Sequence, residues 1–189
     1  MHLHFSEIGN CDASVQCCQE ANIPLHKVTT TKQQMEEYGA DIHLANATEL
    51  SSNKGQRKGH RVAIVTKGIG KVTTKTRYEE DANYNMLMDS GRWMEMCIPI
   101  EGGNQYIVVA NLYGISGASG DDDIKRDNDN LIAMAIARMM MFKNVPYYLC
   151  TDANISKEES DILKGTIREG IVHDIFAEWE NNENLQTTY

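Results

Sequence analysis

The apolar residues of this chain gather in short runs, separated by polar or glycine-containing segments. Runs of this length and composition are typical of strands rather than of helices. They predict buried strands over residues 14–18, 41–45, 61–66, 93–98, 105–112, 147–151 and 171–175. Residues 71–77 alternate Lys with Thr and predict an exposed strand, whereas the Gly-containing linker 101–104 predicts an antiparallel hairpin.

Helical spacing is confined to three segments. Apolar residues recur at intervals of three and four from residue 128 to 144, which predicts a helix leading into the strand at 147–151. Two segments with capping-box spacing, each followed by a glycine, predict short helices at 31–39 and 156–170. We expect loops at 51–59, 78–90 and 114–127, no assignable element at 1–13, and a polar tail from 181.

Strands therefore dominate, and the helices can cover them. This pattern predicts an α/β (α+β) fold in which helices pack on mixed, mostly antiparallel sheets. At 189 residues the chain is long enough for a single domain with its own core.

The segment at 145–154 organises the candidate chemistry. Its apolar strand stops abruptly at Asp152, Ala153 and Asn154. Side chains two apart on a strand point the same way, so Asp152 and Asn154 project together. A carboxylate beside a carboxamide can hold a phosphate and a nucleophile, although Asp and Asn also favour ordinary turns.

Charge and cysteine content narrow the possibilities. The formal net charge of -9 disfavours a broad nucleic-acid surface. Eight Lys and Arg lie between residues 54 and 77, on either a solvated hairpin or a phosphate-facing patch. Five cysteines, four of them in or beside apolar runs, indicate an intracellular protein, cytoplasmic or nuclear, without a zinc site. We expect no secretory signal and no membrane span.

Five segments, in order, resemble motifs of the endonuclease/exonuclease/phosphatase superfamily. One is an apolar strand followed by Gln19 and Glu20, and another is a hairpin that ends at Tyr113. Asp152 and Asn154 resemble the family's Gly-Asp-Phe-Asn signature, although Thr151 and Ala153 depart from it. The matching segments are 12–20, 61–65, 91–93 with 106–114, 151–154 and 170–174.

The resemblance implies a four-layer α/β sandwich and metal-dependent cleavage of phosphate esters. By position, Glu20 would be a metal ligand, with magnesium as the candidate ion, and Tyr113 would contact the scissile phosphate. Asp152 would orient or activate the attacking water, and Asn154 would hold the phosphate. The substrate would be nucleic acid or another phosphodiester.

Each assignment has a structural alternative. Glu20 could begin an exposed turn, and Tyr113 could be an ordinary aromatic residue at a strand end. Asn111 is interpreted as a structural anchor. His173 and Asp174 are also interpreted as structural, because they reverse the order of the family's terminal Asp-His and lie too early in the chain.

Measured against the family, residues 1–189 would form an incomplete sandwich, without the first strand and the last two. We therefore expect a fragment or degenerate copy of a metal-dependent phosphodiesterase that is weak or inactive alone. The alternatives are a non-catalytic binding module that retains the fold, and an unrelated α/β domain. A discriminating expectation is geometric, because only the first two hypotheses require Glu20 and Asp152 to be neighbours.

Overall fold

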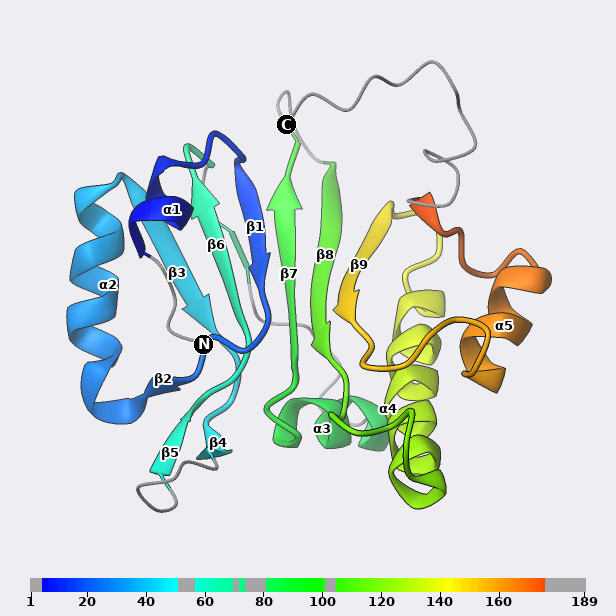
Figure 1. The fold of residues 1–189 in the computed structure, drawn as a ribbon. Coiled ribbons are helices and arrows are strands. Elements are labelled where there is room, and N and C mark those ends of the chain that lie inside the picture. Colours follow the sequence, from blue (N-terminus) through cyan, green and yellow to red (C-terminus); the bar gives the residue numbers. More distant parts are fainter. Residues whose placement is uncertain (1–4, 51–56, 70–71, 74–80, 101–104, 176–189) are drawn as a thin grey trace.

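The computed structural model describes residues 5–50, 57–69, 72–73, 81–100 and 105–175 (Figure 1). Among these residues, no helix is long and apolar enough to cross a membrane. The elements are, in order, α1 (Phe5–Asn10), β1 (Val15–Cys18), β2 (Ile23–Pro24), η1 (Leu25–Lys27), α2 (Val28–Glu37), β3 (Ala40–Leu44), β4 (Thr48–Leu50), β5 (Arg57–His60), β6 (Ala63–Lys67), α3 (Ala82–Asp89), β7 (Trp93–Pro99), β8 (Tyr106–Tyr113), α4 (Asp122–Met140), β9 (Tyr147–Asp152) and α5 (Asp161–Arg168).

The first sheet has the strand order β1-β6-β3, and its central strand β6 pairs antiparallel with both neighbours. Both faces of β6 are buried, which explains its continuous apolar run. Ala63 and Val65 pack toward Met35 of α2, whereas Ile64 faces the second sheet. A small antiparallel sheet, β2-β5-β4, lies at one end of this half of the molecule (Figure 1).

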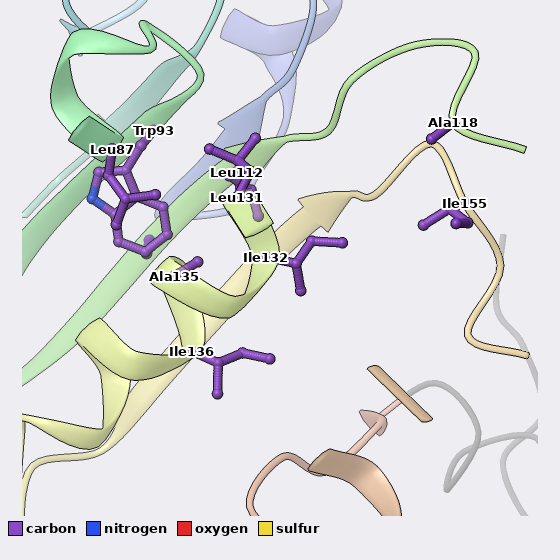
Figure 2. Packing of buried hydrophobic residues seen from close by; sticks show 10 residues of the cluster. Leu87, Trp93, Leu112, Ala118, Leu131, Ile132, Ala135, Ile136 and Ile155 are labelled. Carbon is purple, nitrogen blue, oxygen red and sulfur yellow. The ribbon is translucent and has the colours of Figure 1, made fainter. Parts of the chain in front are cut away.

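The second sheet has the order β7-β8-β9. β7 and β8 form the predicted antiparallel hairpin, whereas β9 pairs parallel with β8 after the chain crosses over through α4. Figure 2 shows the apolar face of α4 packed on this sheet, with Leu131 beside Leu112. Trp93 of β7 and Leu87 of α3 extend the same core.

The two sheets pack face to face. Ile64 of β6 meets Met94 and Met96 of β7 and Val109 of β8 in one apolar cluster. The layers are therefore α2, the β1-β6-β3 sheet, the β7-β8-β9 sheet, and α3 with α4 (Figure 1). This arrangement confirms the α/β fold with mixed, mostly antiparallel sheets that the apolar pattern predicted.

One ion pair is buried between α4 and the second sheet. Arg138 donates to both carboxylate oxygens of Glu95, at 3.0 Å through Nε and 2.7 Å through Nη2. Both side chains are almost fully excluded from solvent. The Arg138 guanidinium also lies over the rings of Tyr84 and Phe142. The bidentate geometry satisfies a charged pair that would otherwise be costly to bury.

Several predicted helix boundaries were wrong, and for two helices a capping Asp, rather than apolar spacing, marks the start. Segment 78–90, predicted as a loop, contains α3, whose start is capped by the Asp81 carboxylate. α4 begins at Asp122, capped by Asp121, inside the predicted loop 114–127. α2 begins at Val28 rather than at residue 31, and α1 lies in the unassigned segment 1–13.

Other corrections concern short elements. Ser156 and Glu159 make the reciprocal bonds of a capping box, but they close a turn, and Ser160 caps α5 instead. Residues 171–175 do not form a strand; Ile171 N bonds back to Thr166 O and closes the end of α5. The predicted loop 51–59 contains part of β5, and 51–56 lie outside the described residues. The predicted strand 71–77 lies largely outside them too, although Thr73 pairs with Cys97 of β7.

Candidate active site

Four sequence-predicted residues lie at one end of the sandwich, where three strands finish. The parallel register pairs Tyr113 of β8 with Asp152 of β9, and directly paired residues project from the same face. That face is turned toward the first sheet, where Glu20 follows β1. The Tyr113 phenol donates a hydrogen bond to the Glu20 carboxylate. Glu20 and Asp152 therefore both adjoin Tyr113.

Asn111 holds the Glu20 side of this arrangement in place. Its fully buried amide donates to Ala63 O at 2.9 Å and to Cys18 O at 3.2 Å. Its Oδ1 accepts from Gln19 Nε2 at 2.6 Å. These bonds join the second sheet to Cys18, the last residue of β1, to its partner Ala63 at the start of β6, and to Gln19, which precedes Glu20. The predicted role of Asn111 as a structural anchor is confirmed.

The Asp152 side is fixed by backbone contacts. Gly114 N donates to Asp152 O at 2.7 Å, and the Asn154 amide donates to Gly114 O at 3.0 Å. A Cβ at Gly114 would lie 2.2 Å from Ala153 O, so only glycine allows this close approach. Asn154 N also donates to Asp152 Oδ1 at 3.2 Å, as in an Asx turn.

Asn128 of α4 connects the two loops that leave β8 and β9. This fully buried side chain accepts from Ile115 N at 2.7 Å and donates to Ala153 O at 2.8 Å. It therefore fixes the position of Tyr113 relative to Asp152. This role could not be predicted from local sequence, because Asn128 looks like the polar start of the predicted helix.

Two candidate residues have left-handed backbones. Glu20 has φ 52° and Asn154 has φ 52°. Asn tolerates this conformation, but it is uncommon for Glu and costs on the order of 1 kcal/mol. A strained residue persists only where its surroundings hold it, and the contacts of Gln19 and Tyr113 do so here. The backbone thus directs the Glu20 carboxylate toward the end of β8.

Arg92, which sequence analysis considered only as part of a matched segment, lies beside the aromatic ring of Tyr113. Its guanidinium is 5.1 Å from the ring centroid and donates to Gly114 O at 2.6 Å. Burial, and then the charge of Arg61, lowers the pKa of Arg92 below its usual value. The Arg92 guanidinium therefore places a positive charge beside Tyr113 and favours an anionic ligand there.

The Tyr113 phenol is a neutral donor. Burial, and then the hydrogen bond with Glu20, raises the pKa of Tyr113 above its usual value. The hydroxyl also lies 3.1 Å from Ser116 Oγ, a second partner that sequence analysis missed. Tyr113 is 4 % exposed, so its hydroxyl is held in one orientation rather than moving freely in water.

Oxygen ligands dominate the site. The Glu20 carboxylate, half-buried, is a hard oxygen donor of the kind that magnesium prefers, and its partner Tyr113 also contacts Ser116. Within the described ranges, no group of three or more His, Cys, Asp and Glu gathers to hold a metal. The donor set fits magnesium, which is commonly bound through one or two carboxylates and keeps several waters.

Other candidates lie elsewhere or have structural partners. Asp174 forms an ion pair with Lys157 at 2.8 Å, in keeping with its predicted structural role. In the segment 54–77, which carries eight Lys and Arg, Lys67 donates to Gly9 O at 3.0 Å and Arg61 donates to Glu49 O at 2.6 Å. Four of its eight basic residues, at positions 54, 71, 75 and 77, lie outside the described residues.

No family model and no curated protein sequence matches the chain. Its structure, however, is similar to that of the human Nocturnin catalytic domain, with a TM-score of 0.52 and 10 % identity over 82 % of this chain and 56 % of that chain. An endonuclease/exonuclease/phosphatase family protein from Bacteroides thetaiotaomicron gives a TM-score of 0.56 and 13 % identity over 88 % and 59 %. ANGEL2, a 2',3'-cyclic phosphatase, gives a TM-score of 0.49 and 19 % identity over 88 % of this chain and 46 % of that chain.

The chain shares the fold of the Nocturnin catalytic domain and of the Bacteroides endonuclease/exonuclease/phosphatase family protein, which is the fold that the sequence resemblance implied. The chain spans about half to three fifths of the length of these structures. At such low identities the similarity establishes the architecture, and chemistry has to be argued from the residues of this chain.

Proposed function

We propose that this chain carries a phosphodiesterase site of the endonuclease/exonuclease/phosphatase type. The observation that supports the proposal is the position of Tyr113, whose phenol bonds to Glu20 while its backbone pairs with Asp152. Glu20, Tyr113 and Asp152, which are suited to phosphate chemistry, thus come from the ends of three separate strands at one end of the sandwich. The substrate class we propose is nucleic acid or another phosphodiester.

Glu20 would hold the ion, with water and substrate oxygens completing its coordination. A bound magnesium ion offsets the negative charge that builds on the phosphoryl oxygens. Tyr113 and Asn154 would donate hydrogen bonds to the phosphate without adding negative charge. Asp152, exposed at the strand end, would accept a proton from the attacking water and orient it.

We further propose that this chain hydrolyses its substrate weakly by itself. Its candidate groups are engaged with one another: the Tyr113 hydroxyl with Glu20 and Ser116, and the Asn154 amide with Gly114 O. Each has to exchange its partner before it can contact substrate. The same observation favours a second candidate function, in which the site binds a phosphodiester without cleaving it.

A hydrolysis assay and a magnesium titration together test these proposals. Cleavage of short DNA and RNA oligonucleotides and of bis(p-nitrophenyl) phosphate is measured with magnesium and with EDTA. We expect slow, magnesium-dependent cleavage that Asp152→Ala reduces by at least about 100-fold, as for the loss of a general base. Tyr113→Phe, which keeps the ring but lacks the donor, should cost about 10–1,000-fold.

The magnesium titration distinguishes an enzyme from a binding module. Magnesium at about ten times its dissociation constant stabilises the folded state by about 1.4 kcal/mol, which raises Tm by a few degrees. Glu20→Gln should abolish this shift, whereas Glu36→Gln, at an exposed position of α2, should retain it. A magnesium shift and oligonucleotide binding without cleavage support the binding module. If the wild-type chain shows neither a magnesium shift nor cleavage, both the phosphodiesterase and the binding-module proposals are contradicted.

A further inference from the structure

Two cysteines from opposite sheets face each other near the site. Cys17 of β1 packs into the apolar cluster between the sheets. Cys150 of β9 pairs in register with Asn111, so both side chains project toward the first sheet. Asn111 reaches across to Cys18 O, which places Cys150 close to the end of β1. The two thiols thus lie close enough for each to shift the pKa of the other.

The two thiols differ in accessibility and acidity. Cys150 is exposed, whereas Cys17 is half-buried. The hydrogen bond from Cys17 lowers the pKa of Cys150 to about 7, against the opposing effect of burial. The same hydrogen bond, followed by burial, raises the pKa of Cys17. Cys150 therefore has the features of an attacking thiolate and Cys17 those of its resolving partner.

We propose that Cys17 and Cys150 form a reversible disulfide that connects the two sheets when the chain meets a peroxide. In the first step the Cys150 thiolate attacks hydrogen peroxide, the O–O bond breaks, and hydroxide leaves behind a sulfenic acid. The Cys17 sulfur then attacks the Cys150 sulfur, the S–O bond breaks, and the hydroxide takes the Cys17 proton and departs as water. Each sulfur gives up one electron, and the peroxide takes up two.

The strand arrangement allows the sulfurs to approach. β1 and β9 are the edge strands of their sheets within the described residues, so each can shift without breaking a second ladder. A disulfide also needs side chains that point toward each other, as these two do. Cys18 is adjacent in sequence but packs on the opposite face of its sheet, against the α2 side. Cys97 lies on β7, on the face turned toward α4.

The bond would join the strands that lead into the candidate site. Glu20 follows Cys17 by three positions, and Asp152 follows Cys150 by two. A covalent link at this point closes most of the chain into one loop, and such links stabilise mainly by restricting the unfolded chain. The proposal does not depend on catalysis, because it concerns only the geometry of the two strands.

The test uses the full reduced chain and hydrogen peroxide. Free thiols are blocked with N-ethylmaleimide after oxidation, and peptides are identified by mass spectrometry without reduction. We expect an intramolecular cross-link between the peptides that carry Cys17 and Cys150. Tm should rise by roughly 10 °C on oxidation and return to its starting value with dithiothreitol.

Matched variants identify the partner of Cys150. Cys18→Ser should retain both the cross-link and the Tm rise, whereas Cys17→Ser and Cys17→Ala should lose both. Circular dichroism of the reduced variants confirms that they are folded, and the wild-type cross-link is informative without any variant. The proposal is overturned if Cys150 stays reduced, and is therefore alkylated by N-ethylmaleimide, while other thiols oxidise. It is also overturned if Cys150 of Cys17→Ala forms a cross-link with Cys11 or Cys18 and gives the same Tm rise.

Discussion

Replacement of Asn111 by Leu tests whether a single amide holds the two sheets in register. Asn111 lies on β8 with no exposed surface, and Leu has a similar volume without polar atoms. The substitution removes three hydrogen bonds, to Gln19 Nε2, Cys18 O and Ala63 O. It therefore removes the buried polar contacts of β8 with the end of β1 and the start of β6, and leaves the Tyr113–Glu20 bond as the remaining polar link to the segment that carries Glu20.

The expected loss follows from these contacts. A typical intramolecular hydrogen bond contributes about 1 kcal/mol net, so three give about 3 kcal/mol. The two carbonyl partners are left in a buried environment, which adds to the loss, whereas burial of the Leu side chain offsets part of it. We expect about 2–4 kcal/mol, a large share of the roughly 5–15 kcal/mol that stabilises a domain.

Urea unfolding followed by fluorescence and circular dichroism measures this difference. The midpoint should fall with an unchanged m-value if the folded state keeps its compactness. Asn130→Leu, at an exposed position of α4, is the control and should stay within about 0.5 kcal/mol of wild type. A loss below about 1 kcal/mol for Asn111→Leu would refute the inference that this amide anchors the sheets.

Three further predictions concern the second sheet and its helices. Arg138→Met leaves the buried Glu95 carboxylate without its main partner and should cost about 3–5 kcal/mol in urea unfolding, much of which Glu95→Leu in the same chain should restore. Burial, and then the charge of Glu95, raises the pKa of Tyr147 above 10.0. The neutral phenol is thus favoured in the fold, so stability should be full below about pH 10 and fall above it, and Tyr147→Phe should flatten that fall in urea titrations. Gly114→Ala should lower the free energy of unfolding by about 1–3 kcal/mol, because the new Cβ clashes with the Ala153 backbone. Gly165→Ala, in an open position of α5, should raise it by about 0.5–1 kcal/mol. Equal effects of the two substitutions would exclude the clash.

Short apolar runs were sufficient to locate the strands of the two larger sheets, β1-β6-β3 and β7-β8-β9, but not those of the small sheet β2-β5-β4. The runs that became β6, β8 and β9 were predicted within a few residues, because each contributes apolar side chains to a buried layer. Helices were less visible. α3 buries only Leu87 among its residues and depends on the Asp81 cap, so its apolar spacing was too weak to predict it.

The site was partly visible in the sequence. The family resemblance singled out Glu20, Tyr113, Asp152 and Asn154, and the fold brings these residues to one end of the sandwich. Arg92 and Asn128 acquire their importance only from contacts with residues far away in the chain. Their residue types alone are common on surfaces and at helix starts, so local sequence could not distinguish them.

The sequence by itself determined the strands, the sheet class and the resemblance to one superfamily, because these depend on the order and spacing of apolar residues. Which strand ends meet was decided by tertiary structure alone. The parallel pairing of β8 with β9 places Asp152 beside Tyr113, and the packing of the two sheets brings Glu20 to the same phenol. Such contacts join residues distant in sequence, and they form only when the two sheets pack face to face.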